Sequence, residues 1–94
     1  MRLAIKLWTI QDCEGCKILR RVLTEAIEHN SDLNIDFVEI DATNSTRKHL
    51  SYLGNYKIGD FPAFQFIKDG VVVLSDSGSR PKAFIQRYID LYFK

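Results

Sequence analysis

The sequence has few cysteines, almost no excess charge and no long apolar run. Its 94 residues include only two cysteines and two prolines, and their formal net charge is +1 at pH 7. A near-neutral chain lacks the long-range attraction that draws basic proteins to nucleic acid or to acidic membranes. No apolar run approaches the roughly 20 residues that a membrane-spanning helix needs. We therefore predict no nucleic-acid partner and no membrane partner.

The length and composition are typical of one globular domain, which we expect to span residues 1–94 as a monomer. A chain of this size buries roughly 60–65% of its unfolded surface, which is enough for a hydrophobic core that needs no disulfide bonds to stabilise it. Its first apolar run is too short for a signal peptide and no small-residue cleavage site follows, which predicts a cytoplasmic location. In that reducing compartment a cysteine pair is more often catalytic or metal-binding than a structural bridge.

Both cysteines lie in one short motif, Cys-Glu-Gly-Cys at positions 13–16. An apolar, β-prone run from Leu3 to Thr9 precedes the motif, and a helical pattern from about Glu14 to His29 follows it. The first backbone N–H groups of a helix lack intrahelical partners, and together with the helix dipole they stabilise a negative charge. A thiolate is such a charge, and it is the form that attacks a disulfide. The motif therefore predicts redox chemistry.

The two cysteines are expected to differ in accessibility. Cys16 falls on the apolar stripe of the predicted helix, so its side chain should turn inward, whereas Cys13 should stay accessible. We predict that Cys13 is the attacking thiol and that Cys16, its neighbour on the helix surface, is the resolving thiol. Asp12 and Glu14 oppose ionisation of the first thiol, while Lys17 favours it. We expect the pKa of Cys13 in the upper part of the range of ~3.5–7.5 known for such motifs.

The middle of the chain continues with a strand and a short helix. Apolar residues within 34–40 predict a strand, which completes a strand–helix–strand unit and favours parallel pairing with the first strand. A polar turn then leads to a short helix at about 46–53, with Gly54 at its expected end.

The last third predicts a hairpin and a helix. The run 63–67 predicts a strand, and Asp69-Gly70 predicts a tight turn to a strand at 71–74, followed by a polar loop at 75–79. Pro81 suits the first turn of a last helix. We expect the apolar face of that helix to contain Phe84, Ile85, Tyr88, Ile89 and Tyr92. The element order β-α-β-α-β-β-α is that of an α/β fold.

This order, together with short sequence features, resembles the thioredoxin superfamily over nearly the whole chain. The Cys-Glu-Gly-Cys motif follows the first strand, Phe61-Pro62 opens the third strand, and the hairpin sequence 66–72 precedes Gly78. The resemblance implies a thioredoxin-like mixed central sheet with helices on both faces. It also implies a cis bond before Pro62, packed beside the cysteine pair. It assigns substrate binding to Phe61 and Pro62, with the Phe61 backbone pairing with the bound chain.

A second resemblance concerns glutaredoxin-like proteins. Residues 77–81, Ser-Gly-Ser-Arg-Pro, are similar to a segment of the redoxins that supply electrons to ribonucleotide reductase. The residues between the cysteines differ from those of both thioredoxin and glutaredoxin. Leu7 stands where thioredoxins have a buried strand aspartate, so proton transfer there must use another group or water. We expect Arg80 to face solvent rather than a partner's carboxylate.

The resemblance implies a dithiol–disulfide oxidoreductase that reduces protein disulfides. Its catalytic residues would be Cys13 and Cys16, and it would need no cofactor beyond the redox-active disulfide that they form. A thioredoxin reductase-like flavoprotein or glutathione would reset this disulfide. Ribonucleotide reductase is a candidate acceptor of the electrons.

Two other interpretations stay open. A zinc site commonly takes four Cys or His ligands, and only His29 and His49 are available besides the cysteines. Neither histidine has ligand spacing to the pair, so we predict no metal site within one chain. A metal or cluster would need two chains that share Cys13 and Cys16. The other interpretation is a non-catalytic thioredoxin-fold module that binds partners along the edge at 61–62.

Overall fold

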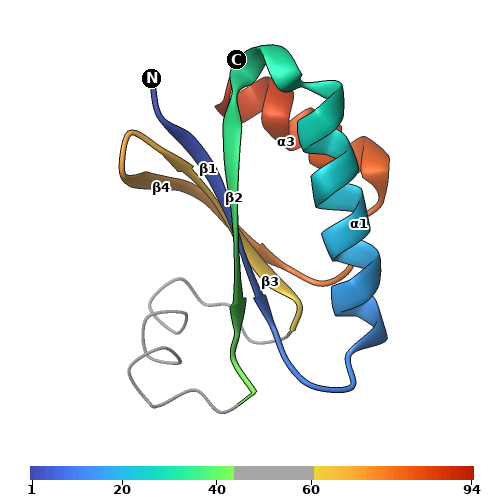
Figure 1. Ribbon diagram of the computed structural model, residues 1–94. Coiled ribbons are helices and arrows are strands. Elements are labelled where there is room, and N and C mark those ends of the chain that lie inside the picture. The colour runs from blue at the N-terminus through green and yellow to red at the C-terminus, as the bar shows by residue number, and fades with distance from the viewer. Residues whose placement is uncertain (44–60) are drawn as a thin grey trace.

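The computed structural model describes residues 1–43 and 61–94. In chain order the elements are β1 (Leu3–Thr9), α1 (Glu14–His29), a 3₁₀ turn η1 (Ser31–Leu33), β2 (Ile35–Asp41), β3 (Ala63–Lys68), β4 (Val71–Ser77) and α3 (Lys82–Tyr92), as Figure 1 shows. The bounds of β1 and α1 are those predicted from the sequence. The short helix predicted at about 46–53 lies outside the described residues.

The four described strands form one mixed sheet in the order β2-β1-β3-β4. Strands β1 and β2 run parallel because helix α1 crosses over between them, whereas β3 runs antiparallel to β1 and to β4. The hairpin between β3 and β4 turns at Asp69 and Gly70, whose φ angles are +52° and +82°. Positive φ at both positions suits the tight turns that match the twist of a hairpin. The mixed sheet and the predicted hairpin are therefore confirmed.

Helices α1 and α3 lie on the same face of the sheet (Figure 1). One apolar core fills the space between the helices and the sheet. It includes Leu3, Ile5, Leu7, Leu19, Leu23, Phe64, Phe66, Ile85, Ile89 and Phe93. Because neighbours along a strand point to opposite faces, Trp8 lies on the other face, where it packs with Ala63. The helix expected on that other face is the one at about 46–53, so helices on both faces stay a prediction.

The apolar face predicted for α3 is partly wrong. Ile85 and Ile89 are fully buried, but Phe84 is 48% exposed. Phe93, which the sequence did not place in the core, is fully buried and stacks on Phe66 with ring centroids 4.8 Å apart. Residues four apart share one side of a helix, whereas Phe84 precedes Ile85 and points about 100° away from it. The buried side of the helix therefore continues through Phe93.

Strand β4 is longer than predicted. The polar loop predicted at 75–79 is wrong in its first part, because Ser75–Ser77 continue β4 and pair with β3. Serine and aspartate have little preference for strands. Strand formation also depends on a neighbouring strand to pair with, and here β3 is that neighbour. Pro81 is also displaced from the predicted first turn, because it precedes α3 as the N-cap residue, with φ −63° and ψ 156°.

Asp76, near the end of β4, is the centre of a hydrogen-bond cluster that ties this strand to α3. Its carboxylate accepts bonds from Arg80 Nε (2.9 Å) and Nη2 (3.0 Å), from the Tyr88 hydroxyl (2.9 Å) and from the Ser77 backbone N–H (2.8 Å). Arg80, predicted to face solvent, keeps 42% of its side chain exposed, but it also pairs with Asp76, a partner that the sequence did not predict because the longer β4 brings this carboxylate within reach. We call Asp76, Arg80 and Tyr88 the Asp76 cluster.

The Asp76 cluster favours the ionised form of its carboxyl. Partial burial acts to raise the pKa of Asp76, but the hydrogen bonds from Arg80, Ser77 and Tyr88 outweigh it and leave the pKa below its ordinary value. In the unfolded chain an aspartate titrates at about 3.9. Ionised Asp76 therefore favours the folded state above that pH, and this contribution is lost as the pH falls through the lower pKa of the folded state.

We expect the substitution Asp76→Asn to lower the free energy of unfolding at pH 7 by about 1–2 kcal/mol, because it removes a charged acceptor from several donors. The difference from the wild type should be smaller at about pH 3 than at pH 7, because pH 3 lies below the unfolded-state pKa of about 3.9, where the stabilising contribution of the charge has begun to be lost. Urea unfolding at both pH values measures the effect.

The matched control is Asp36→Asn, which changes an exposed carboxylate on β2 and should shift the stability by less than about 0.5 kcal/mol. A difference between Asp76→Asn and wild type that is equal at both pH values would contradict this account of the cluster.

Candidate active site

Cys13 and Cys16 are joined by a disulfide at the start of α1, with their Cα atoms 5.2 Å apart. Cys13 is the N-cap residue, and its Sγ accepts a hydrogen bond of 3.0 Å from the backbone N–H of Cys16. Cys13 is partly exposed, whereas Cys16 is only 2% exposed. The predicted difference in accessibility is therefore confirmed, and the catalytic roles of the two sulfurs stay predictions.

The turn before Cys13 depends on an unusual backbone conformation. Asp12 has a φ of +57°, in the left-handed region that few residues other than glycine adopt. Aspartate tolerates this region better than most side chains. The conformation turns the chain sharply between β1 and α1 and delivers Cys13 to the N-terminus of the helix, where free backbone N–H groups converge.

The charged side chains next to the motif pair with each other. Lys17 Nζ lies 3.3 Å from Glu14 Oε1, and both side chains are largely exposed. An exposed ion pair of this kind contributes little to stability because solvent screens it. Lys17 is thus directed to Glu14 in this structure, and the donor observed at the Cys13 sulfur is the Cys16 backbone N–H.

Pro62 lies beside the cysteine motif. The Phe61–Pro62 peptide bond is cis, as the resemblance implied, and Pro62 is buried. A Cβ atom placed on Gly15, between the two cysteines, would lie 3.4 Å from Pro62 Cδ and 3.7 Å from Ser79 Cβ. The Pro62 carbonyl in turn accepts a 2.7 Å hydrogen bond from the Gly78 backbone N–H. Three distant parts of the chain therefore meet at the disulfide.

Phe61, predicted to bind substrate through its backbone, is half-buried. Its side chain packs against the small cluster of Trp8 and Ala63 on the face of the sheet opposite α1 and α3. The aromatic ring therefore anchors the segment that carries Pro62. The pairing of the Phe61 backbone with a substrate stays a prediction.

Leu7, at the position of the strand aspartate of thioredoxins, is fully buried. Its neighbours in the sheet are Glu39 on β2 and Phe64 on β3, and Phe64 is in turn paired with Asp76 on β4. Both carboxylates of this row are bound by arginines. Arg20, from α1, contacts Glu39 through Nε and through Nη2, the latter at 2.9 Å from Oε2. The hydrogen bond to Glu39 raises the pKa of Arg20.

A groove of about 330 Å³ lies next to the turn that leads to Cys13. It is lined by the chain segment 9–11 and by Arg20, Glu39 and Asp41. The side-chain hydroxyl and then the backbone N–H of Thr43 hydrogen-bond to Asp41 and lower its pKa. The groove therefore presents a polar, ionised surface on the β2 side of the disulfide.

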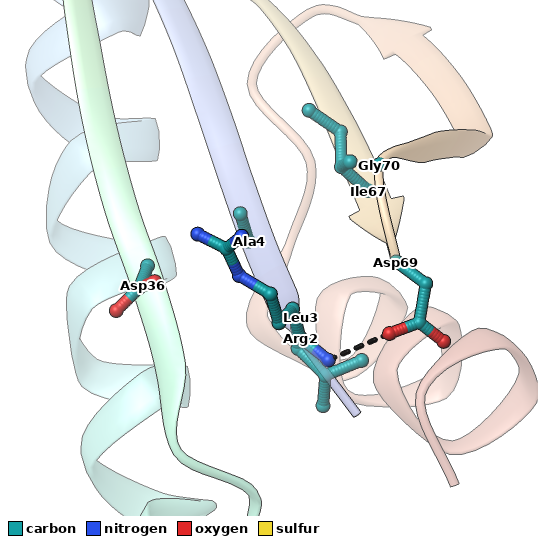
Figure 2. A pocket seen from close by; sticks show the side chains of 7 residues that line it. All are labelled: Arg2, Leu3, Ala4, Asp36, Ile67, Asp69 and Gly70. Carbon is teal, nitrogen blue, oxygen red and sulfur yellow. Dashed lines mark hydrogen bonds between the residues drawn. The ribbon is translucent and has the colours of Figure 1, made fainter.

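A second cavity, shown in Figure 2, has a volume of about 410 Å³ and is lined by Arg2, Asp36, Ile67 and Asp69, among others. It lies at the first residues of β1, and the cysteine motif follows the last residues of that strand. Because β1 has seven residues, these two ends are roughly 20 Å apart. This cavity is therefore separate from the cysteine site.

Sequence reasoning missed two features of the site. It did not foresee that Ser79 lies beside Gly15, or that Asp76 organises the segment that follows it. The only signal in the sequence was the resemblance of residues 77–81 to a known redoxin segment.

Within residues 1–43 and 61–94, no group of three or more His, Cys, Asp or Glu side chains is arranged to hold a metal ion. In the same residues no helix is long and apolar enough to cross a membrane.

Comparisons with solved structures find the same fold. Oxidized thioredoxin O2 from Arabidopsis thaliana is similar with a TM-score of 0.74 at 17% sequence identity, over 99% of this chain and 76% of that one. Thioredoxin f2 from Chlamydomonas reinhardtii is similar with a TM-score of 0.71 at 17% identity, over 98% of this chain and 81% of that one. No curated protein sequence matches the chain.

A family model described as Thioredoxin matches residues 4–91, which extend from β1 into α3. That range includes the disulfide-bonded pair, the cis proline and the closing hairpin. These features support a thiol–disulfide oxidoreductase, and the extent of the match shows that the chain belongs to the thioredoxin family.

Proposed function

We propose that this protein reduces protein disulfides through the Cys13–Cys16 dithiol. The observation that carries the proposal is the asymmetric pair itself: a partly exposed sulfur at the N-terminus of α1 is bonded to a sulfur that is 2% exposed. An accessible thiolate at a helix start is suited to attack, and a buried neighbouring thiol is suited to resolve the product.

The reaction proceeds in two exchanges. The Cys13 thiolate attacks one sulfur of the substrate disulfide, which forms a mixed disulfide and releases the other substrate sulfur as a thiolate. The Cys16 thiol then loses its proton and attacks Cys13 Sγ, which releases the second substrate sulfur. The substrate gains two electrons, its two thiolates take up the proton released by Cys16 and one proton from water, and the protein is left with the Cys13–Cys16 disulfide.

The geometry suits both exchanges. The Cys16 backbone N–H, 3.0 Å from Cys13 Sγ, stabilises negative charge on the attacking sulfur in the first exchange. The separation of 5.2 Å between the Cα atoms lies within the usual range for a disulfide, so ring closure needs little backbone movement. Phe61 and Pro62, next to the pair, would hold the substrate chain.

The oxidised protein must be reset by an external dithiol or by glutathione. A thioredoxin reductase-like flavoprotein and glutathione are the two candidate donors. Either fits the predicted cytoplasmic location and a monomeric protein, and no further cofactor is required.

The substitution Cys16→Ser should trap a covalent mixed disulfide between Cys13 and a protein substrate, because the resolving thiol is removed while the attacking thiol is kept. Mass spectrometry of non-reduced samples measures the adduct. Cys13→Ser and the double substitution are the controls and should yield no adduct. Full disulfide-reducing activity in Cys13→Ser would disprove the mechanism.

The redox midpoint of the pair decides the direction of the reaction. We expect a midpoint near or below about −230 mV, as for reductants of this kind, because Asp12 and Glu14 disfavour the thiolate and thereby favour the disulfide. Equilibration in glutathione buffers, followed by alkylation and mass measurement, gives the value. A midpoint above about −180 mV would instead indicate an oxidase or isomerase.

Ribonucleotide reductase is the acceptor that we propose among protein disulfides. The support is the resemblance of residues 77–81 to redoxins that serve this enzyme. With the reduced protein as the sole dithiol, a ribonucleotide reductase should form deoxyribonucleotide in proportion to the protein supplied. Turnover no greater than with the Cys13→Ser variant would remove this acceptor and leave the general reductase proposal in place.

A further inference from the structure

We propose that the Asp76 cluster positions residues 77–81 against Pro62 and the cysteine motif, so that Arg80 and Tyr88 determine how well the protein binds polypeptide disulfides. The inference rests on the proposed reductase function. It concerns residues that do not touch the sulfur atoms, and we therefore call them positioning residues.

The first step is the rigidity of the cluster. The Asp76 carboxylate accepts two bonds from the Arg80 guanidinium, one from the Tyr88 hydroxyl and one from the Ser77 backbone N–H. A bidentate arginine–carboxylate pair fixes geometry as well as distance. The Asp76 side chain is only 19% exposed, so solvent screens the pair less than an exposed one. Segment 77–81 is thereby held at its first residue, Ser77, and at Arg80, the residue before its last.

The second step is the path of the chain between these two residues. Gly78 has a φ of +94°, which favours glycine, and its N–H donates a 2.7 Å hydrogen bond to the Pro62 carbonyl. Ser79 follows, is exposed, and lies 3.7 Å from the position of a Cβ on Gly15. A shift of this segment would therefore move the surface directly beside the disulfide.

The third step concerns which substrates would bind less well after such a shift of segment 77–81. A polypeptide that brings a disulfide to Cys13 must lie along the surface around it, which includes the exposed Ser79. A small disulfide needs only access to the sulfur of Cys13. Loosening the segment should therefore weaken binding of polypeptides and leave the sulfur chemistry unchanged. A role confined to overall stability would affect both substrate types alike.

The test compares Arg80→Lys and Tyr88→Phe with the wild type. Arg80→Lys keeps the charge but loses the bidentate hydrogen bonding to Asp76. Tyr88→Phe keeps the ring but loses the hydroxyl that donates to Asp76. Each should raise the KM for insulin, used as a polypeptide disulfide, by roughly three- to tenfold, the range that the loss of one hydrogen bond produces. The kcat, the redox midpoint and the rate with 2-hydroxyethyl disulfide should not change.

The matched control is Tyr92→Phe, one helical turn beyond Tyr88 on α3, which should leave every value at that of the wild type. A second measurement does not depend on activity. Amide hydrogen exchange at Gly78 should be faster in Arg80→Lys and Tyr88→Phe than in wild type or Tyr92→Phe, because the segment that holds its N–H against Pro62 is loosened.

The outcomes separate this inference from the proposed function. If the wild type reduces insulin and the two cluster variants match Tyr92→Phe in KM and in exchange, this inference alone is wrong. If the midpoint or the small-disulfide rate moves together with KM, the cluster acts on the sulfur pair and the inference is also wrong. A wild type that reduces neither substrate would disprove the proposed function and this inference together.

Discussion

The site depends on the antiparallel pairing of β1 with β3, which joins residues far apart in the sequence. In an antiparallel pair, the end of one strand lies beside the beginning of the other. Trp8, near the end of β1, therefore pairs with Ala63 at the start of β3. The cysteine motif follows β1 and Pro62 precedes β3, so the same pairing brings the motif and Pro62 to one edge of the sheet. The position of Gly15 beside Pro62 follows from this register.

The start of α1 joins helix formation to chemistry. Cys13 is the N-cap, and its sulfur accepts the Cys16 N–H that would otherwise lack a partner. Capping residues usually supply an oxygen for this purpose. Here the same bond that completes the helix also stabilises negative charge on the sulfur. The buried stripe of α1 takes Cys16 into the protein, so one helix makes the two thiols different.

Two arginine–carboxylate pairs flank an apolar centre in the row of the sheet that contains Leu7. Arg20 holds Glu39 on β2, and Arg80 holds Asp76 on β4. Leu7 and Phe64 are fully buried between them. A charge at the centre of this row would need a partner or would lose its ionisation, because burial disfavours the charged form. The sequence places its carboxylates at the two sides of the row instead, where guanidinium groups from α1 and from the segment before α3 can reach them.

The sequence by itself determined β1, α1 and the unequal burial of the two cysteines. Alternation over Leu3–Thr9 and a helical stripe over Glu14–His29 are local signals that need no distant partner. Only the tertiary structure decided the last residues of β4, the burial of Phe93 and the partner of Arg80. Each of these depends on a surface that another part of the chain supplies: the backbone of β3, the ring of Phe66 and the carboxylate of Asp76. The meeting of Gly15, Pro62 and Ser79 likewise follows from strand pairing and not from local propensity.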